Sequence, residues 1–497
     1  MLADIYEGLM LMLTLPSLGL LLGGVFMGVV FGAIPGLTGG IAIAIVLPFT
    51  FYLNAVEGLS LLSGIYVGGS FGGSIAAILF GTPGAPEAGI TVADGYPLAQ
   101  KGFPGRALDT ALYASAFANV LSSLIMIVLA VGIAAFALLI GPTEYFSIIL
   151  FSLVLISTLG MGAAWHKGLI AVTLGLIASF VGADPISSIS RLDFGILALS
   201  SGLSLIPVLV GLFVGAEIIG QAGIVRGGEG GPEPITFGGK DDRLTMRELI
   251  GLMPIIVRGS LIGSVIGALP GLNAAVSAMI NYSVTKRLSP HPELFGTGII
   301  EGIAAPESGN NGTVGPTLCP LLTLGIPGSG TAALFLGALL MQGVTPGPTI
   351  FESHGEVVYG LFYALLFSSL LLIVVGKFVF QFAKYIPRIP VQIINPCIIL
   401  FCVAGAFAVS NQTADVFVLL FFMLTGYFMR LVGLPIIPLL IGYLLGELLE
   451  SSLRRSLLIS GDDYSVFFTQ PISLVFLILT AGLLGYAVFG RIREKKV

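Results

Sequence analysis

Four long stretches of this sequence carry no charged residue, and this feature restricts the chain to a membrane-embedded fold. Asp, Glu, Lys and Arg are all missing from residues 8–56, 110–143, 259–285 and 308–351. Each stretch is longer than the ~20 residues with which a helix crosses a lipid bilayer. The strands of a membrane barrel would alternate polar and apolar residues over about ten positions, and no such alternation is visible. The sequence therefore predicts an all-α integral membrane protein, a polytopic helical bundle.

Composition excludes several other classes of protein. Charged residues make up 9% of the chain and hydrophobic residues 56%, whereas globular proteins carry about 25% charged residues. The net charge of -5 is thinly spread, and no basic patch with interleaved aromatic residues suggests a nucleic-acid partner. Cys319, Cys397 and Cys402 lie in apolar runs without metal-ligand spacing, so we expect them to be packing residues. No cofactor is expected apart from a transported Na⁺ or H⁺.

Two Pro-Gly breaks occur twice in the chain, in the same order. Gly-Ala-Ile-Pro-Gly-Leu-Thr at 32–38 is echoed by Gly-Ala-Leu-Pro-Gly-Leu-Asn at 267–273, and Gly-Thr-Pro-Gly at 81–84 by Gly-Ile-Pro-Gly at 325–328. The first offset is 235 residues (270 minus 35) and the second is 244 (327 minus 83). An insertion of nine residues in the second copy reconciles the two offsets. Helix breakers are tolerated at membrane depth mainly where they line a cavity, and paired broken segments are typical of transporter binding sites.

The positions of basic residues predict that the two halves thread the membrane in opposite directions. Basic residues near span ends mark the cytoplasmic side. In the first half they follow the second break, at Lys101 and Arg106, whereas in the second half they follow the first break, at Lys286 and Arg287. This pattern predicts an inverted-topology repeat, with about seven crossings in the first half.

The expected organisation follows from this charge pattern. The N-terminus should be periplasmic, and the basic tail at 491–496 places the C-terminus in the cytoplasm. Arg454 and Arg455 do not fit, because they fall on the outer side if every apolar run after Val391 crosses once. Either the run at 433–449 does not cross, or segment 450–470 lies on the surface. The predicted parts are a first inverted repeat at 1–222, a cytoplasmic linker at 223–248, and a second inverted repeat with extra C-terminal helices at 249–497.

The broken segments are the predicted ligand site. Backbone N–H groups at a half-helix N-terminus attract carboxylates, and unwound carbonyl groups can hold Na⁺. The alternative is that the many small residues here serve close helix packing, which we expect for most of the Gly and Ala. The predicted substrate-binding residues are Thr38, Ser74, Thr82, Pro83, Gly84, Asn273, Pro327, Gly328 and Ser329. The predicted cation-binding residues are Gly36, Glu307, Ser308, Asn310 and Asn311.

Glu307 is the acidic residue best placed to bind a cation or a proton. A charged carboxylate at the bilayer centre costs at least ~2.5–3.5 kcal/mol, and residues 308–351 after it are uncharged. Glu301 follows Lys286, Arg287 and His291 closely, so we expect it near the cytoplasmic interface. The roles of Glu87 and Asp94 stay open, because the basic residues after them place their segment near the inner surface.

Long blocks of the sequence resemble the large membrane subunit of tripartite tricarboxylate transporters. These blocks are 32–53, 66–105 with Gly-Thr-Pro-Gly and Asp-Gly-Tyr-Pro-Leu-Ala, and 295–348 with Glu-Gly-Ile-Ala-Ala-Pro-Glu-Ser. The resemblance implies a permease of the bacterial inner membrane that works with a small membrane subunit of about four helices and a periplasmic solute-binding protein. It also implies cation-coupled uptake of carboxylates.

We therefore expect a secondary active transporter that imports a tricarboxylate or related organic acid. The alternative is a carboxylate-selective channel, or an exporter that does not depend on a binding protein. An enzyme is not expected, because the three histidines are dispersed and no His-Glu-x-x-His motif occurs. The sequence does not choose among citrate-like, dicarboxylic and aromatic acids, nor between Na⁺ and H⁺. Elevator-like motion is expected by family analogy alone.

Overall fold

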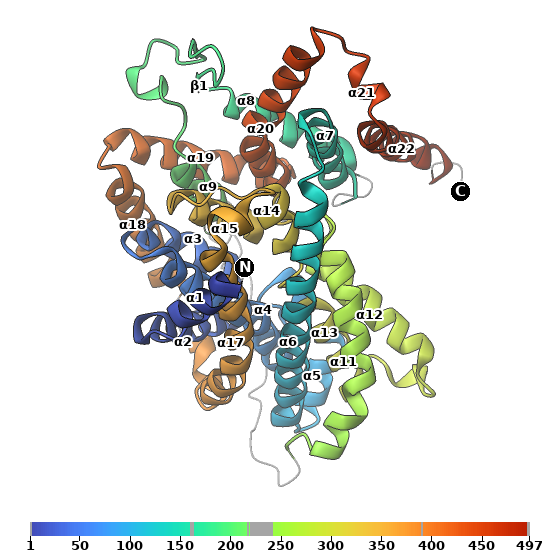
Figure 1. Ribbon diagram of the computed structural model, residues 1–497. Helices are drawn as coiled ribbons and strands as arrows, with labels where there is room; N and C mark the ends of the chain where they lie inside the picture. The colour runs from blue at the N-terminus through green and yellow to red at the C-terminus, as the bar shows by residue number, and fades with distance from the viewer. Residues whose placement is uncertain (1, 160–163, 216–217, 219–241, 389–390, 495–497) are drawn as a thin grey trace.

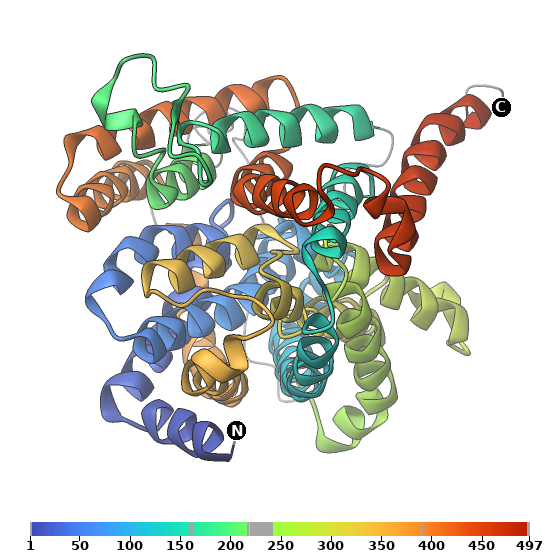
Figure 2. The same ribbon diagram turned by 45° about the horizontal axis from the view of Figure 1, so that its top comes forward.

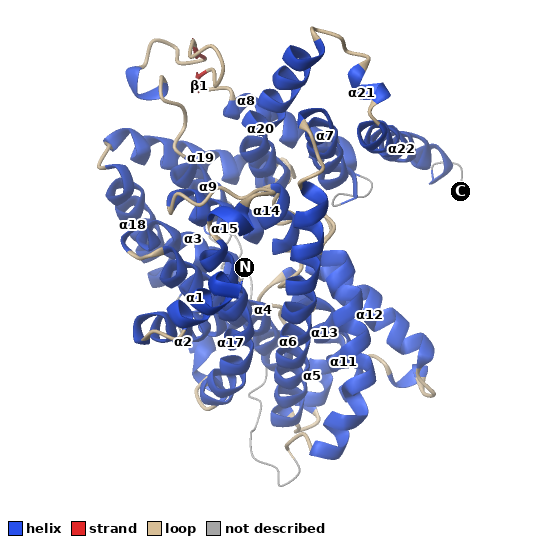
Figure 3. Ribbon diagram, viewed as in Figure 1, coloured by secondary structure: helices blue, strands red, loops and turns tan. Residues whose placement is uncertain are grey.

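Helices make up nearly all of the described structure. The computed structural model describes every residue except 1, 160–163, 216–217, 219–241, 389–390 and 495–497 (Figure 1). In the described part of the chain, strands occur as one short antiparallel hairpin, in which β1 (Gly182–Ala183) pairs with β2 (Ser190–Arg191) (Figure 3). Nine of the described helices are long and apolar enough to cross a membrane. The predicted all-α, polytopic fold is therefore confirmed.

The helices follow one another with short connections. In the first half they are α1 (Leu2–Met12), α2 (Leu15–Ala33), α3 (Gly39–Val46), η1 (Leu47–Tyr52), α4 (Ala55–Phe80), η2 (Pro86–Ala88), α5 (Val92–Gln100), α6 (Pro104–Ala137), α7 (Pro142–Leu159), α8 (Trp165–Ser179), η4 (Leu197–Leu199) and α9 (Leu205–Val214). In the second half they are α11 (Met246–Gly267), α12 (Ala274–Leu288), η7 (Pro292–Leu294), α13 (Ile300–Asn311), α14 (Leu318–Leu324), α15 (Gly330–Met341), α16 (Ile350–Ser353), α17 (Gly355–Phe380), η8 (Ala383–Arg388), α18 (Val391–Ser410), α19 (Thr413–Leu431), α20 (Ile436–Ser460), α21 (Val466–Thr469) and α22 (Pro471–Glu494).

The linker predicted for 223–248 lies outside the described residues as far as residue 241. Its last three residues, 246–248, form the first turn of α11. This turn begins with a capping box, in which Thr245 and Glu248 bind one another's backbone N–H groups at 2.9 and 3.3 Å. Such a box satisfies two donors that a helix start otherwise leaves free. Residues 246–248 therefore belong to a helix, and the division of the chain into two repeats and a linker stays a prediction.

Glycine faces let α2 and α4 pack in direct backbone contact. Gly28 of α2 faces Ile65 and Gly69 of α4, and a Cβ atom added at Gly28 would lie 2.3 Å from the Ile65 carbonyl oxygen. The contacting glycines recur every four residues on both helices, which is the small-residue spacing of close membrane helix pairs. The facing sets are Gly24, Gly28 and Gly32 on α2, and Gly64, Gly68 and Gly72 on α4. These glycines therefore have the packing role that the sequence left as an alternative.

The long helix of each half packs against the other half. Helix α6 stands near the middle of the molecule, between α17 and α11 (Figure 1), and contacts α11, α13 and α14 of the second half. In return, α17 contacts α2 and α4 of the first half. The two halves are therefore interlocked through α6 and α17.

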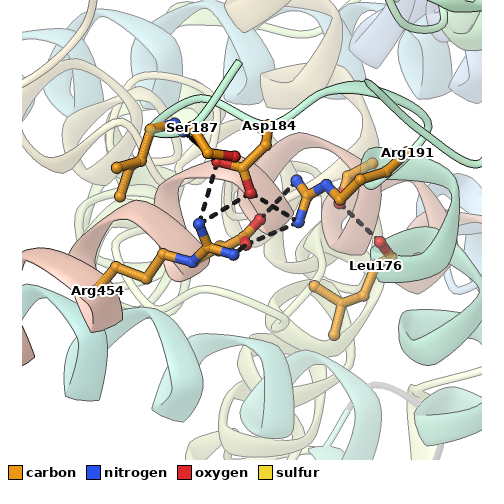
Figure 4. Close-up of polar contacts among 8 residues, drawn as sticks. Leu176, Asp184, Ser187, Arg191 and Arg454 are labelled. Atoms are coloured by element: carbon orange, nitrogen blue, oxygen red, sulfur yellow. Dashed lines mark hydrogen bonds and ion pairs between the residues drawn. The ribbon is translucent and has the colours of Figure 1, made fainter. Parts of the chain in front are cut away.

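Arg454 lies within helix α20. This helix runs without interruption from Ile436 to Ser460, so Arg454 belongs to a helix that has the length and hydropathy of a membrane span. The guanidinium group of Arg454 lies 2.8 Å from Asp184 and 2.8 Å from Glu450, and Arg191 binds the same two carboxylates (Figure 4). Because two carboxylates balance two arginines, this cluster of four side chains has no net charge.

The C-terminal helix lies at the edge of the molecule. Helix α22 contacts α7 and α21, and its C-terminal end points away from the other helices in both views (Figures 1 and 2). It is therefore remote from α13 and α4, where the predicted ligand residues gather.

Candidate functional site

The first break of each half has the same local geometry. After α2, Pro35 is followed by Gly36 with φ +87°, and after α11, Pro270 is followed by Gly271 with φ +86°. Glycine suits this left-handed region because it has no Cβ atom. Each break thus turns the chain in the same way before a new helix begins.

The residue two positions after each of these glycines caps the next helix. Thr38 Oγ1 accepts from the N–H of Ile41 at 3.3 Å at the start of α3, and Asn273 Oδ1 accepts from the N–H of Val276 at 3.0 Å at the start of α12. Thr and Asn are favoured helix caps because their side chains satisfy a free N–H group. Thr38 and Asn273, both predicted substrate residues, therefore have a structural role at the breaks, and Asn273 is exposed.

The second breaks also match one another. Helix α4 ends at Gly81 with φ +66°, and α14 ends at Gly325 with φ +65°, so both helices have a left-handed glycine cap. After the second of these breaks, Ser329 Oγ accepts from the N–H of Ala332 at 3.1 Å and caps α15. In the first half the corresponding segment, Thr82 and Pro83, is exposed.

The two breaks of each half touch one another. Gly84 packs so closely on Gly32 that an added Cβ atom would lie 2.1 Å from the Gly32 carbonyl oxygen. In the second half the N–H of Gly271 donates to the carbonyl oxygen of Gly328 at 3.0 Å, and Pro327 and Gly328 are buried. No hydrogen bond among the described residues joins segment 82–84 to segment 327–329. The broken segments therefore meet within each half.

Contacts between the halves are reciprocal. The helix after the second break of the second half, α15, packs on α3, which follows the first break of the first half. Likewise η2, which follows the second break of the first half, packs on α12, which follows the first break of the second half. Each half thus places its second break against the helix that follows the other half's first break.

Glu307 is a buried carboxylate that forms no ion pair with a described basic residue. Its side chain is completely buried, and three hydroxyl groups from the first half donate to it. Ser74 of α4 and Thr91 donate to Oε1 at 2.6 and 2.5 Å, and Ser115 of α6 donates to Oε2 at 2.9 Å. No ion pair with a described residue neutralises it, and the charged group that acts on it is another carboxyl, Glu87.

Asn311 extends this polar cluster by one helical turn. Its Nδ2 donates to Ser115 Oγ at 2.9 Å and to the Glu307 carbonyl oxygen at 3.0 Å, and its Oδ1 accepts from Asn119 at 3.0 Å. The Oδ1 atom of Asn119 is buried without a donor among the described residues. The cluster therefore offers a carboxylate and an unused amide oxygen, which are groups that hard cations bind.

The other predicted cation ligands face elsewhere. Ser308 lies against α12, where its hydroxyl accepts from Asn281 at 3.1 Å, and Asn310 donates to the Ser70 carbonyl oxygen at 3.3 Å. Gly36 lies in the first break and contributes backbone geometry. The structure thus brings together Glu307, Asn311 and Ser74, of which Ser74 had been assigned to the substrate. The roles of all these residues in binding stay predictions.

Three members of the cluster were missed from the sequence: Thr91, Ser115 and Asn119. A signal for two of them was present, because Ser115, Asn119 and Ser122 recur at spacings of four and three in the otherwise apolar run 110–143. This spacing puts them on one face of α6. Thr91 lies just outside α5 and carries no comparable pattern.

Asp94, whose role the sequence left open, fastens a loop. It is fully buried and accepts from the N–H groups of Gly296 and Gly298, each at 2.9 Å at the nearest oxygen, and from the hydroxyl of Tyr282 at 2.9 Å. A carboxylate with several N–H donors is well satisfied as an anion. Asp94 therefore holds the loop before α13 against α5 of the other half.

Comparison with known proteins identifies the family of the chain. The model of the Tripartite tricarboxylate transporter TctA family matches residues 18–441. The uncharacterized 52.8 kDa protein in the TAR-I ttuC' 3' region of Agrobacterium vitis is 35% identical over 475 residues, covering 95% of this chain and 93% of that protein. An uncharacterized protein in the TAR-II ttuC' 3' region of the same organism is 37% identical over 234 residues, covering 47% of this chain and 97% of that protein. No solved structure matches the chain. With the family model spanning most of its length, this chain belongs to the tripartite tricarboxylate transporter TctA family.

Proposed function

We propose that this chain is the transporting membrane subunit of a carboxylate importer, driven by a gradient of Na⁺ or H⁺. Its partners would be a small membrane subunit and a periplasmic solute-binding protein, and its place the bacterial inner membrane, with the N-terminus periplasmic and the C-terminus cytoplasmic. Membership of a tripartite transporter family supports the other subunits. The substrate class would be tricarboxylates or related organic acids.

The observation that carries the proposal is the buried charge site at Glu307. A carboxylate without a cationic partner at membrane depth costs several kcal/mol, and neutral hydroxyl donors offset part of this cost. Protonation or a bound Na⁺ would remove the rest. Because Glu307 belongs to the second half while Ser74, Thr91 and Ser115 belong to the first, cation binding there would act on the contact between the halves.

The paired breaks support the proposed substrate site and the inverted repeat. Matching φ angles at Gly36 and Gly271, and at Gly81 and Gly325, indicate two copies of one unit. The reciprocal packing of α3 on α15 and of η2 on α12 is what a twofold relation between the copies would produce. Backbone N–H groups near the breaks, such as those of Thr82, Gly328 and Ser329, would receive the carboxylate.

Concentrative uptake tests the proposal directly. The complex, reconstituted with its partner subunits in proteoliposomes, should accumulate citrate above the external concentration under an inward Na⁺ gradient or an inward H⁺ gradient. Collapsing the effective gradient with an ionophore should return the internal concentration to the external value. Equilibration without accumulation under both gradients would contradict coupling and favour a channel, since channels do not concentrate their solutes.

A further inference from the structure

A pocket with a largely apolar wall lies around Arg258, apart from the Glu307 cluster. It has a volume of about 270 Å³ and lies between α11, α12 and the start of α13. Arg258, Ser289, His291, Ile299 and Glu301 contribute to its wall. This volume is close to the lower end of the range for small-molecule pockets. The pocket could therefore hold a molecule with a few carbon atoms.

Arg258 has a fixed position and spare hydrogen-bond donors. Its Nε donates to Asn281 Oδ1 at 3.3 Å and one Nη2 hydrogen to Thr285 Oγ1 at 2.6 Å. A guanidinium group has five N–H donors, so three have no acceptor among the described residues. No described carboxylate forms an ion pair with Arg258 either. Since both acceptors are neutral, the positive charge of Arg258 is available to an anion in the pocket.

The start of α13 borders the pocket through Ile299 and Glu301. An anionic partner already occupies this helix start, because the carboxylate of Asp94 accepts from the N–H groups of Gly298 and Ile299 at 2.9 and 3.2 Å. The positive charge offered to an anion in the pocket is therefore that of Arg258.

Glu301 adds a negatively charged group to the pocket. Its carboxylate shares the wall with Arg258, yet the two do not come within the 4.0 Å of an ion pair. A ligand between them would need an anionic group for Arg258 and a hydrogen-bond donor for Glu301. A carboxylic acid that also carries a hydroxyl group satisfies both, whereas a dicarboxylate without a hydroxyl group has no hydrogen-bond donor to offer Glu301.

We propose that this pocket is a binding site for a small hydroxycarboxylate, with its carboxylate on Arg258 and its hydroxyl group donating to Glu301. The inference rests on the proposed function in taking the ligand to be an organic acid. Lys286 and Arg287, at the adjoining end of α12, place the pocket on the predicted cytoplasmic side. An imported acid would therefore meet it after passing the breaks.

Thiol protection measures binding here without any transport. Gly251 lines the pocket and has open space where a Cβ atom would be added, so Gly251→Cys introduces a thiol without a clash. Cys319 and Cys402 are buried, and the exposed Cys397 is removed by Cys397→Ala. The full complex in nanodiscs of zwitterionic lipid is treated with a water-soluble maleimide in the presence of malate, succinate or aspartate. These acids share a carbon skeleton and differ by a hydroxyl group, a hydrogen atom or an ammonium group.

Malate should halve the labelling rate of Gly251→Cys at a concentration at least about tenfold below that of succinate. Arg258→Gln should abolish protection by both acids. Glu301→Leu should bring malate close to succinate, because it removes the acceptor of the hydroxyl group. A control thiol at Lys286→Cys, which is exposed outside the pocket, should label at the same rate throughout.

Four results would overturn the proposal. The first is labelling of Gly251→Cys that no acid slows, and the second is protection that persists in Arg258→Gln. The third is protection by aspartate alone, which would assign the pocket to an amino acid. The fourth is slow labelling of Gly251→Cys in nanodiscs of anionic lipid before any acid is added, which would identify a phosphate headgroup as the occupant of the pocket. Citrate accumulation by the wild-type complex is scored separately, so failure here leaves the transport proposal standing.

Discussion

Hydroxyl groups, rather than basic residues, surround the charge of Glu307. Each of the three donors comes from a different segment of the first half, and each bond is 2.5–2.9 Å long. A hydrogen bond to a charged group is worth about 1.5–3 kcal/mol. The donors therefore stabilise the ionised form and would set the affinity of the proposed site for a cation.

Removing one donor should change the cation dependence of uptake. Thr91→Val keeps the shape of the side chain but deletes a bond to Oε1, so the charged carboxylate loses about 1.4 kcal/mol, a tenfold change in binding. If the cation is a proton, it should bind more tightly and half-maximal uptake should move to higher pH by about one unit. If it is Na⁺ held partly by the Thr91 oxygen, the half-saturating concentration should rise about tenfold.

Matched variants separate this effect from general damage. Thr91→Ser retains the hydroxyl group and should behave as wild type. Ser368→Ala removes a buried hydroxyl that bonds within its own helix, to the Leu365 carbonyl oxygen, and should leave the cation dependence unchanged. An unaltered pH and Na⁺ dependence in Thr91→Val would show that the cation binds elsewhere.

Gly84 is a residue whose lack of a side chain is required by the fold. In Gly84→Ala the new Cβ atom would lie 2.1 Å from the Gly32 carbonyl oxygen, and backbone cannot move aside as a side chain can. We expect a loss of at least ~1–3 kcal/mol, as for overpacked cores, and a lower melting temperature of the purified protein. Gly23→Ala on α2, where nothing lies within 4 Å, is the matched control. Equal melting temperatures for the two variants would contradict the close contact of the breaks.

The sequence alone predicted these residues unevenly. The Pro-Gly breaks were visible because Pro and Gly restrict the backbone in ways that a single sequence displays. Glu307 was visible because charge is rare at membrane depth. Thr91 and Asn119 were missed, because hydroxyl and amide side chains occur throughout membrane helices. Their role depends on hydrogen-bond partners that lie far away in the sequence.

At the level of elements, the loop between α8 and α9 is fastened to α20 by four charged residues. Asp184 and Glu450 alternate with Arg191 and Arg454 in this network (Figure 4). The N–H groups of Ser187 and Ile186, together with Arg454, hold the pKa of Asp184 below its usual range. The charge pattern of the sequence placed Arg454 on an unexpected side, because it could not reveal the contact with Asp184, 270 residues away.

Asp184→Asn should loosen this loop. The amide keeps an acceptor for the backbone N–H groups but loses the attraction to both arginines, so hydrogen exchange in 182–202 should become faster. Since the folded pKa lies below the ordinary value, the stabilisation is present above pH ~4 and is lost as the pH falls toward the folded pKa. Wild-type exchange, corrected for its intrinsic pH dependence, should therefore show constant protection between pH 6 and 8. Glu447 forms no ion pair among the described residues, so the control Glu447→Gln should show the hydrogen exchange of the wild type in 182–202. Exchange that is faster in this control as well would contradict a stabilising role of the charged network.

At the scale of the whole molecule, the two halves depend on one another for their packing. Helix α6 fits against the second half and α17 against the first, while α13 carries Glu307 into contact with α4 and α6. The charge pattern predicted oppositely threaded halves, and the repeated motifs predicted their correspondence. Neither pattern could predict that α6 packs on the second half and α17 on the first, because contacts between helices leave no fixed spacing in one sequence.

Such an arrangement would suit a transport cycle in which cation binding controls the movement of the two halves relative to one another. An empty, ionised Glu307 would hold the first-half hydroxyl groups tightly, and a bound cation would weaken that hold. The coupling of cation and carboxylate would then arise at the contact between the halves, and a variant that is permanently neutral at Glu307 should lose it.

The measurement that tests this account most directly compares two modes of transport in Glu307→Gln. The complex is reconstituted with its partner subunits, and citrate is followed both as gradient-driven accumulation and as exchange against citrate trapped inside. We predict that Glu307→Gln folds normally and retains exchange, because the amide oxygen still accepts from Ser74 and Thr91 and its NH2 group can donate to Ser115, but that it loses accumulation by at least about tenfold. Accumulation equal to that of the wild type, under the same Na⁺ or H⁺ gradient, would contradict a cation site at Glu307.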